Sequence, residues 1–202
     1  MQSLDTAAEV NFSPLLHRYT LEEFWTLPEP EDRSHYELIG GLLFMVPPPE
    51  PPHGSIDARL AASLHGHLLA NNVLGEVHHP REAIYIDEVA GTYLEPDMMY
   101  VSDELRLRLG RKRKCADIVF EYLSESTAVY NRTTKAHTYL ALGVRELWLI
   151  DPVTVTIEVR YATERKGRPA WETWSYSRGD SAESRVLVGW QVSVSELFEG
   201  LV

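Results

Sequence analysis

The sequence is poor in cysteine, in basic residues and in long apolar runs. Cys115 is the only cysteine among 202 residues, so no disulfide can form within the chain, which fits a reducing compartment. The 19 Lys and Arg against 30 Asp and Glu give a net charge of -11, which argues against a uniformly basic nucleic-acid coat protein. No apolar run approaches the roughly 20 residues that span a bilayer, and residues Met1–Asn11 lack a secretion-signal pattern. We therefore expect a cytoplasmic protein with no membrane segment.

Several familiar catalytic motifs are missing as well. Gly40-Gly41 is not followed by the Lys-Ser/Thr of a phosphate-binding loop, and no Gly-x-Ser-x-Gly nucleophile elbow occurs. Four histidines are candidate zinc ligands, but they have neither cysteine partners nor the spacing of a zinc protease. They are His65, His67, His78 and His79. The sequence thus disfavours a nucleotide-binding loop, a serine hydrolase and a zinc centre.

The chain is long enough, and with 44% hydrophobic residues apolar enough, for one domain with a substantial core. We expect an N-terminal tail over residues 1–18 and a single domain over residues 19–202, because no repeat or long linker divides the chain. The apolar periodicity indicates a mixed α/β (α+β) fold with one central sheet and flanking helices. The predicted helices are Thr20–Phe24, Ser55–Val73, Thr127–Leu142 (ended by Gly143) and Ser193–Phe198. The predicted strands are a hairpin over Tyr36–Val46, then Glu82–Asp87, Tyr93–Val101, Ala116–Leu123, Val144–Ile150, Val155–Tyr161, Glu172–Tyr176 and Arg185–Val188.

Two carboxylates lie within apolar, strand-like runs. Asp97 follows Pro96 and precedes Met98–Val101, while Glu121 stands in the middle of Ile118–Leu123. Ionised carboxylates are seldom buried without a partner, so a metal ion or a cation is expected near them. The alternatives are a turn-forming or solvent-facing Asp97, and a structural ion pair or an exposed strand edge for Glu121.

Lys135 and Glu37 are the next candidates. Lys135 lies on the helix predicted after Glu121, with Asn131 and Tyr139 on the same face at four-residue spacing. Glu37 is a further carboxylate in an apolar strand. Carboxylates that hold Mg²⁺ and a lysine that stabilises charge are the components of metal-dependent phosphodiester cleavage. The alternatives are an ordinary surface lysine and a glutamate on the open face of a hairpin.

A set of motifs distributed along the chain resembles a known family. They are Tyr36–Gly41, Pro49 with His53, Pro96-Asp97, Phe120–Ser124, Ser126-Thr127, Lys135 with Tyr139, and Gly143–Pro152. Through them the chain is similar to the PD-(D/E)xK nuclease superfamily and, within it, to the bacterial Uma-two family of restriction-endonuclease-like proteins. The resemblance covers about Tyr19 to Phe198, which is nearly the whole chain.

This resemblance implies a restriction-endonuclease-like core in which Asp97 and Glu121 bind Mg²⁺ or Mn²⁺. The superfamily pattern expects a lysine two residues after the glutamate, where this chain has Leu123. The family's lysine has moved to the following helix, and Lys135 matches that place. Glu37 matches an acidic position of the family. Two roles are open for it: completing the metal site or orienting the lysine. His53 matches a recurring histidine without an assigned role, and Asn131 stands where the family often has an aspartate.

A basic cluster lies between the two carboxylate strands. Its members are Arg106, Arg108, Arg111, Lys112, Arg113 and Lys114. We expect a loop near the active site that contacts nucleic-acid phosphates. The alternative is a solvated loop that keeps a sheet edge soluble.

The resulting hypothesis is a Mg²⁺-dependent endonuclease that hydrolyses DNA. A non-catalytic interaction domain that kept the nuclease fold, and a hydrolase of another phosphate ester, are the alternatives. By analogy, a symmetric homodimer would suit cleavage of two strands, because a two-fold axis relates two active sites.

Overall fold

The structure is a computed structural model that describes residues 17–80, 82–86, 91–110 and 113–201. Most of the predicted tail, residues 1–16, lies outside the described residues, so the division into a tail and one domain stays a prediction. The helices are α1 (Leu21–Phe24), α2 (His53–Ala70), α3 (Asp103–Leu109), α4 (Ala128–Tyr130), α5 (Ala136–Leu142) and α6 (Val194–Phe198). A π-helical turn, Asn131–Lys135, joins α4 to α5, so the three form one continuous helix.

In the part of the chain that the structure describes, the strands form three sheets. β2 (Leu42–Val46), β1 (His35–Ile39), β5 (Thr92–Leu94) and β4 (Ile84–Ile86) make a four-stranded sheet in this order. The central sheet has the order β10 (Arg168–Tyr176), β9 (Thr156–Arg165), β8 (Glu146–Asp151), β7 (Ile118–Tyr122), β6 (Met98–Ser102) and β3 (Gly75–His78). Only β7 and β8 are parallel within it, so the sheet is mixed. β11 (Ser181–Glu183) and β12 (Gln191–Ser193) form a small antiparallel pair.

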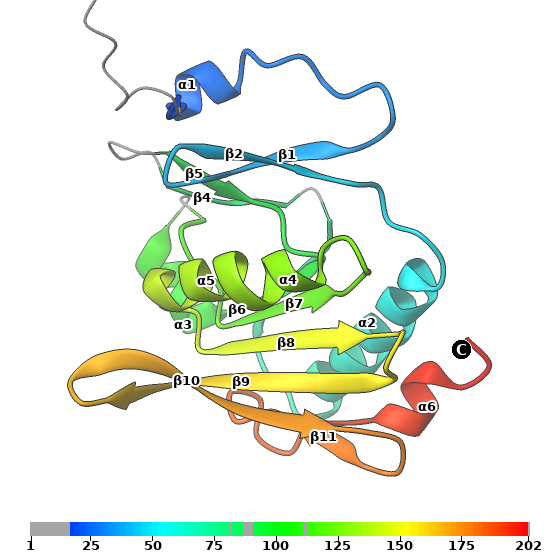
Figure 1. Cartoon of the computed structure of the whole chain (residues 1–202). Coiled ribbons are helices and arrows are strands. Elements are labelled where there is room, and N and C mark those ends of the chain that lie inside the picture. Colours follow the sequence, from blue (N-terminus) through cyan, green and yellow to red (C-terminus); the bar gives the residue numbers. More distant parts are fainter. Residues whose placement is uncertain (1–16, 81, 87–90, 111–112, 202) are drawn as a thin grey trace, which may run out of the picture.

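Helices cover both faces of the central sheet, and the alternation of side chains along β7 shows how (Figure 1). Ile118, Phe120 and Tyr122 belong to the core that includes α2 and α6. Val119 and Leu123 belong to the core on the other face, which includes α5. Because strand side chains alternate between faces, Glu121 points toward α5. This is the arrangement of a mixed α+β domain, which confirms the predicted fold class.

Local sequence signals account for several element ends. Thr20 and Glu23 form a capping box at the start of α1. Gly40 and Gly41 have φ of 55° and 81° and make the two-residue turn between β1 and β2, a conformation that glycine adopts at little cost. Gly143, with φ of 89°, ends α5 in the left-handed conformation, as predicted.

Other predictions were wrong. The run Tyr93–Val101 is two strands, β5 and β6, which belong to different sheets and are separated by Glu95-Pro96-Asp97. Proline cannot donate to a strand ladder, so the chain changes sheets at this point. The predicted strand Arg185–Val188 is a turn, and the strands of that region flank it. Strand β3 and helix α3 were not predicted. The end of the predicted strand Glu82–Asp87, at Asp87, lies outside the described residues.

Candidate active site

Lys135 is buried at the junction of the two main sheets. Its Nζ lies 3.0 Å from Oε1 of Glu37 on β1 and 2.7 Å from Oε1 of Glu121 on β7. Lys135 and Glu121 are each 2% exposed, and Glu37 is fully buried. Three residues from distant parts of the sequence therefore meet in one charge cluster that joins the four-stranded sheet, the central sheet and the α4–α5 helix.

The π-helical turn determines which residues share the lysine's face. The backbone N–H of Ala136 donates to the carbonyl of Asn131, five residues earlier, so the helix is locally wider than an α-helix. Tyr130, five residues before Lys135, consequently shares its face and donates its hydroxyl to Oε2 of Glu37 at 3.0 Å. Tyr139, four residues after Lys135, donates to Oε1 of Glu121 at 2.6 Å. Wider turns of this kind often occur at functional sites.

The two tyrosines were missed as site residues. Tyr139 is buried like a core side chain, but it is also a hydrogen-bond donor to Glu121. A search limited to α-helical spacing cannot associate Tyr130 with Lys135, since only the π turn brings them onto one face. The four-residue spacing of Lys135 and Tyr139 was the signal that could have identified the second tyrosine.

Glu37 has both carboxylate oxygens engaged by the protein. Besides the lysine, Oε1 accepts the backbone N–H of Glu95 at 2.8 Å, while Oε2 accepts Tyr130. Glu121 differs, because its contacts among the described residues use Oε1 alone. Of the two roles considered for Glu37, this geometry favours orientation of the lysine, whereas Glu121 retains Oε2 for a ligand.

Burial and charge act against each other in this cluster. Burial raises the pKa of Glu121 to about 8, although the neighbouring Lys135 opposes the shift. Burial lowers the pKa of Lys135, but attraction to Glu121, Glu37 and Asp97 outweighs it, so the net shift is upward and the lysine stays charged. Burial, reinforced by the carboxylates, also raises the pKa of Tyr130 and of Tyr139, which keeps both hydroxyls protonated as donors. One lysine thus faces two carboxylates. An additional cation beside Glu121 would favour the ionised form of its carboxylate over the protonated form.

Asp97 directly precedes β6, in the connection that crosses between the sheets. Its Oδ2 accepts the backbone N–H of Tyr122 at 2.7 Å, and His53 Nε2 lies 3.0 Å from Oδ1. The His53 ring packs edge-on against the Tyr122 ring, with centroids 4.7 Å apart, and the Tyr122 hydroxyl donates to Asp57. The first residue of α2 therefore holds the aspartate from one side while β7 holds it from the other. The position of His53 suggests a role that the sequence did not assign, namely orienting Asp97.

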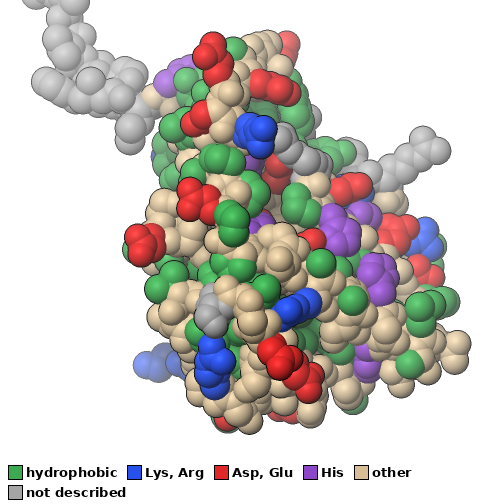
Figure 2. Space-filling model, turned by 90° about the vertical axis from the view of Figure 1, so that its right-hand side faces the viewer, with side chains coloured by type: hydrophobic (Ala, Val, Ile, Leu, Met, Phe, Trp, Pro, Cys, Tyr) green, Lys and Arg blue, Asp and Glu red, His purple; other side chains and the backbone are tan. Residues whose placement is uncertain are grey.

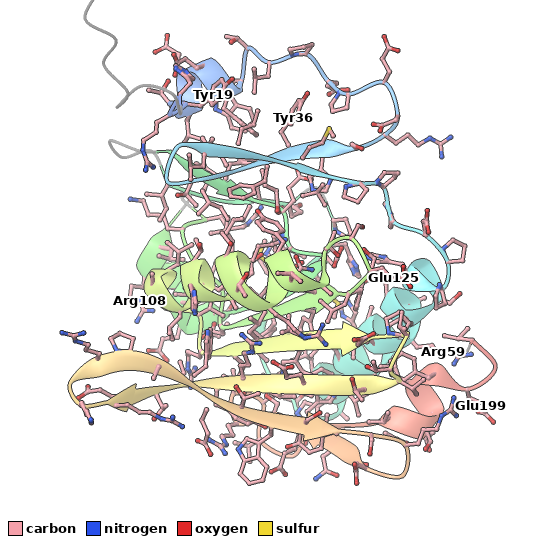
Figure 3. All side chains as sticks on the ribbon, viewed as in Figure 1. Tyr19, Tyr36, Arg59, Arg108, Glu125 and Glu199 are labelled. Atoms are coloured by element: carbon pink, nitrogen blue, oxygen red, sulfur yellow. The ribbon has the colours of Figure 1, made fainter. Side chains whose placement is uncertain are left out.

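Part of this cluster borders a cavity of about 560 Å³, which Glu37 and Tyr139 do not line. Asp97, Glu121, Lys135 and Asn131 contribute to its lining, with walls from the proline-rich loop 47–52 and the turn 124–127. In Figure 3, Glu125 marks this end of the molecule. Figure 2 looks onto the same side and shows hydrophobic, acidic and histidine side chains, with Lys and Arg sparse among them.

The carboxylates that line the cavity suit the implied divalent metal ion. Asp97 and Glu121 offer hard carboxylate oxygens to the same cavity, and Mg²⁺ or Mn²⁺ prefers such ligands. Within the described part of the chain, no group of three His, Cys, Asp or Glu side chains is arranged to hold a metal ion. Two carboxylates fit an ion that takes its remaining ligands from water and a substrate phosphate, which is how Mg²⁺ is commonly bound.

The described members of the predicted basic cluster do not join this site. Arg106 and Arg108 lie on α3, not on a loop, which corrects the prediction; Arg111 and Lys112 lie outside the described residues. Neither these two arginines nor Arg113 and Lys114 line the cavity. Figure 3 shows Arg108 at the opposite end of the molecule from Glu125. Contact of this cluster with nucleic acid stays a prediction, and it would take place away from the cavity.

The fold and the site together define a class: a restriction-endonuclease-like α+β domain with an acid–lysine cluster beside a cavity. The chain belongs to the Uma2 family, whose model, described as "Putative restriction endonuclease", matches residues 21–195. This membership confirms the resemblance inferred from the motifs and supports a hydrolase of the nuclease class.

A solved structure shares the fold. It is the crystal structure of "a putative nuclease belonging to DUF820 from Anabaena variabilis ATCC 29413", which is 22% identical. The match has a TM-score of 0.69 and covers 91% of this chain and 99% of that chain. At this identity the likeness establishes the fold alone. No curated protein matches the chain. Among the described residues, no helix is long and apolar enough to cross a membrane.

Proposed function

We propose that this protein is a metal-dependent endonuclease that hydrolyses phosphodiester bonds of DNA. The observation that carries the proposal is the buried Lys135, which is held between Glu37 and Glu121 and lines a cavity together with Asp97. Burying a lysine with two carboxylates is costly, and hydrophobic residues of similar volume would often be at least as stable. An arrangement of this kind that also lines a cavity is a candidate for chemistry.

Each residue of the site has a distinct task. Asp97 and Glu121 would hold Mg²⁺ or Mn²⁺, which when bound polarises a phosphoryl oxygen and activates water. Lys135 presents its charge to the cavity and stabilises the charge that develops on the phosphate. Glu37, Tyr130 and Tyr139 fix the lysine and Glu121 in place, so little reorganisation is needed during reaction. His53 orients Asp97.

Plasmid cleavage tests the proposal. Wild-type protein with Mg²⁺ or Mn²⁺ is expected to nick or linearise supercoiled plasmid, and EDTA is expected to stop it. Asp97→Ala and Glu121→Ala should abolish cleavage, whereas Glu146→Gln, which alters a buried carboxylate outside the cavity, should retain it in the folded fraction. Cleavage that survives both of the first two substitutions would rule out the site.

The acidic character of the cavity favours one second candidate, a hydrolase of a small phosphate ester. Glu50, Glu95 and Glu125 add to the carboxylates that line it, and a volume of about 560 Å³ accommodates a small molecule. Bis(p-nitrophenyl) phosphate, assayed beside the plasmid, separates the two functions. Turnover of the small ester without plasmid cleavage would favour the second candidate.

A further inference from the structure

The β9–β10 hairpin ends in a small basic tip. β9 ends at Arg165 and β10 begins at Arg168, and only Lys166 and Gly167 lie between them. All four residues are exposed. Figure 1 shows the hairpin extending to the left, at the other end of the molecule from α6 and the chain terminus. Three positive charges within four residues are notable in a chain whose net charge is -11.

The local chemistry of the tip opposes folding stability. Arg165 and Arg168 are register partners, so two like charges face each other across the hairpin, which is destabilising. Lys166 has φ of 53°, where glycine or asparagine would be favoured in a two-residue turn. A tip selected for stability alone would carry different residues, so a role in binding an anion accounts for the composition.

The tip also differs from the basic cluster predicted from the sequence. In that cluster, Arg106 pairs with Asp103 at 3.1 Å and Arg113 pairs with Glu82. Among the described residues, by contrast, the side chains of Arg165, Lys166 and Arg168 form no ion pair or hydrogen bond, and Arg165 is the weakest of the influences that lower the pKa of Glu172. Charges already neutralised by neighbouring carboxylates contribute little to binding a polyanion. The tip is therefore the better candidate for a phosphate contact.

Strand β9 connects the tip to the cavity. It starts at Thr156, the register partner of Asp151, and the next residues after Asp151, Pro152 and Val153, line the cavity. From Thr156 to Arg165 the strand extends over roughly 30 Å at about 3.3 Å per residue. This length corresponds to about nine base pairs at about 3.4 Å each. One nucleic-acid molecule can reach both places if it continues for about one helical turn beyond the cavity.

We propose that Arg165, Lys166 and Arg168 bind the phosphate backbone of a nucleic acid whose scissile phosphate lies in the cavity. The inference rests on the proposed function and names the surface that anchors the substrate. It assigns sequence-independent affinity to the tip, because phosphate contacts position a protein without reading bases. It also predicts that affinity depends on substrate length.

Binding is tested with the full chain in EDTA by fluorescence anisotropy, so that cleavage does not interfere. The triple variant Arg165→Ser, Lys166→Asn, Arg168→Ser removes the charges and places in the turn a residue that tolerates positive φ. For a 30-base-pair duplex we expect at least a tenfold loss of affinity at low salt. The slope of log affinity against log salt should become shallower by about 3, since each phosphate contact contributes about 0.9.

Two controls sharpen the result. Lys166→Asn is compared with Arg178→Ser, which removes one exposed charge just beyond the far end of β10, and only the former should weaken binding. A duplex of about six base pairs is too short to span the distance, so wild type and triple variant should bind it equally.

Equal affinity and equal salt slope for the 30-base-pair duplex would overturn the inference, as would a wild type that binds no DNA. If wild type cleaves plasmid but the tip has no effect, the inference alone fails; if DNA binds through the tip but no substrate is cleaved, the proposed function alone fails.

Discussion

Two buried glutamates on neighbouring strands are held in opposite ways. Glu121 on β7 is 2% exposed and Glu146 on β8 is 1% exposed, yet they point to opposite faces of the central sheet. Glu146 receives four neutral donors: the backbone N–H of Arg185 at 2.5 Å and of Val186 at 2.6 Å, the Ser184 hydroxyl at 2.8 Å and the Trp148 indole at 3.2 Å. Both of its oxygens are used, and it does not line the cavity that Glu121 borders.

Glu121 is held by a cation and a tyrosine through one oxygen, and it lines the cavity. Burial of a carboxylate is therefore a poor indicator of a site when taken alone. The kind of donor, and whether the carboxylate lines the cavity, separate a carboxylate that fastens a turn from one available for chemistry. Substitutions at the two glutamates and at their partners test that distinction.

The largest effect is expected from Lys135→Met. The substitution leaves Glu37 and Glu121 buried without their cation, which should lower the free energy of unfolding by about 3–5 kcal/mol. Urea unfolding followed by circular dichroism measures it. Lys166→Met, at an exposed lysine, should change stability by less than about 0.5 kcal/mol. Equal stability of Lys135→Met and wild type would show that the cluster is not a buried charge network.

Glu146→Gln is expected to cost stability without a loss of chemistry. The amide cannot accept from every donor that surrounds it, and one unsatisfied buried donor costs about 1–3 kcal/mol. Chemical unfolding should show that loss, while plasmid cleavage per folded molecule stays at the wild-type level. Loss of cleavage in a variant that remains folded would remove the distinction between the two glutamates.

The pH dependence of stability should distinguish Glu121→Gln from wild type. Burial raises the folded-state pKa of Glu121 to about 8, above its ordinary value of 4.5, so the folded protein keeps a proton that the unfolded chain releases between these values. The stability from this group is complete below about pH 4.5 and declines as the pH rises through about 8, by at most about 1.4 kcal/mol per pH unit. Urea unfolding without metal, at several pH values from 5 to 8, measures the slope, and the variant should lack this contribution. Parallel curves would contradict the assignment.

Tyr139→Phe is expected to have the smallest effect. It removes one of the two donors to Oε1 of Glu121 while Lys135 remains, which should cost roughly 0.5–1 kcal/mol of unfolding free energy. Thermal unfolding is sensitive enough to detect the difference. Tyr161→Phe, whose hydroxyl donates to a backbone carbonyl remote from the cavity, is the matched control for activity: only Tyr139→Phe should also slow cleavage.

Apolar periodicity predicted the fold class and most of the core elements. The resemblance to the family's motifs singled out Asp97, Glu121 and Lys135, with Glu37 as a further candidate, although these residues are distributed along the chain. What sequence reasoning missed depends on longer-range geometry. The change of sheet at Pro96 breaks a run that reads as one strand, and the donors around Glu146 come from a turn that was predicted as a strand. Tyr130 required knowledge of the π turn, which periodicity based on an α-helix does not reveal.

The π turn also determines how this helix can change in length. It holds one residue more than an α-helical turn, which is why Tyr130 meets the lysine's face from five residues away. Deleting one residue between Tyr130 and Lys135 would leave them four apart, the spacing at which an ordinary α-helix keeps two side chains on one face. Inserting one more residue would instead rotate Tyr130 by about 100° around the axis, away from Glu37. Among relatives, we expect this segment to lose a residue more readily than it gains one.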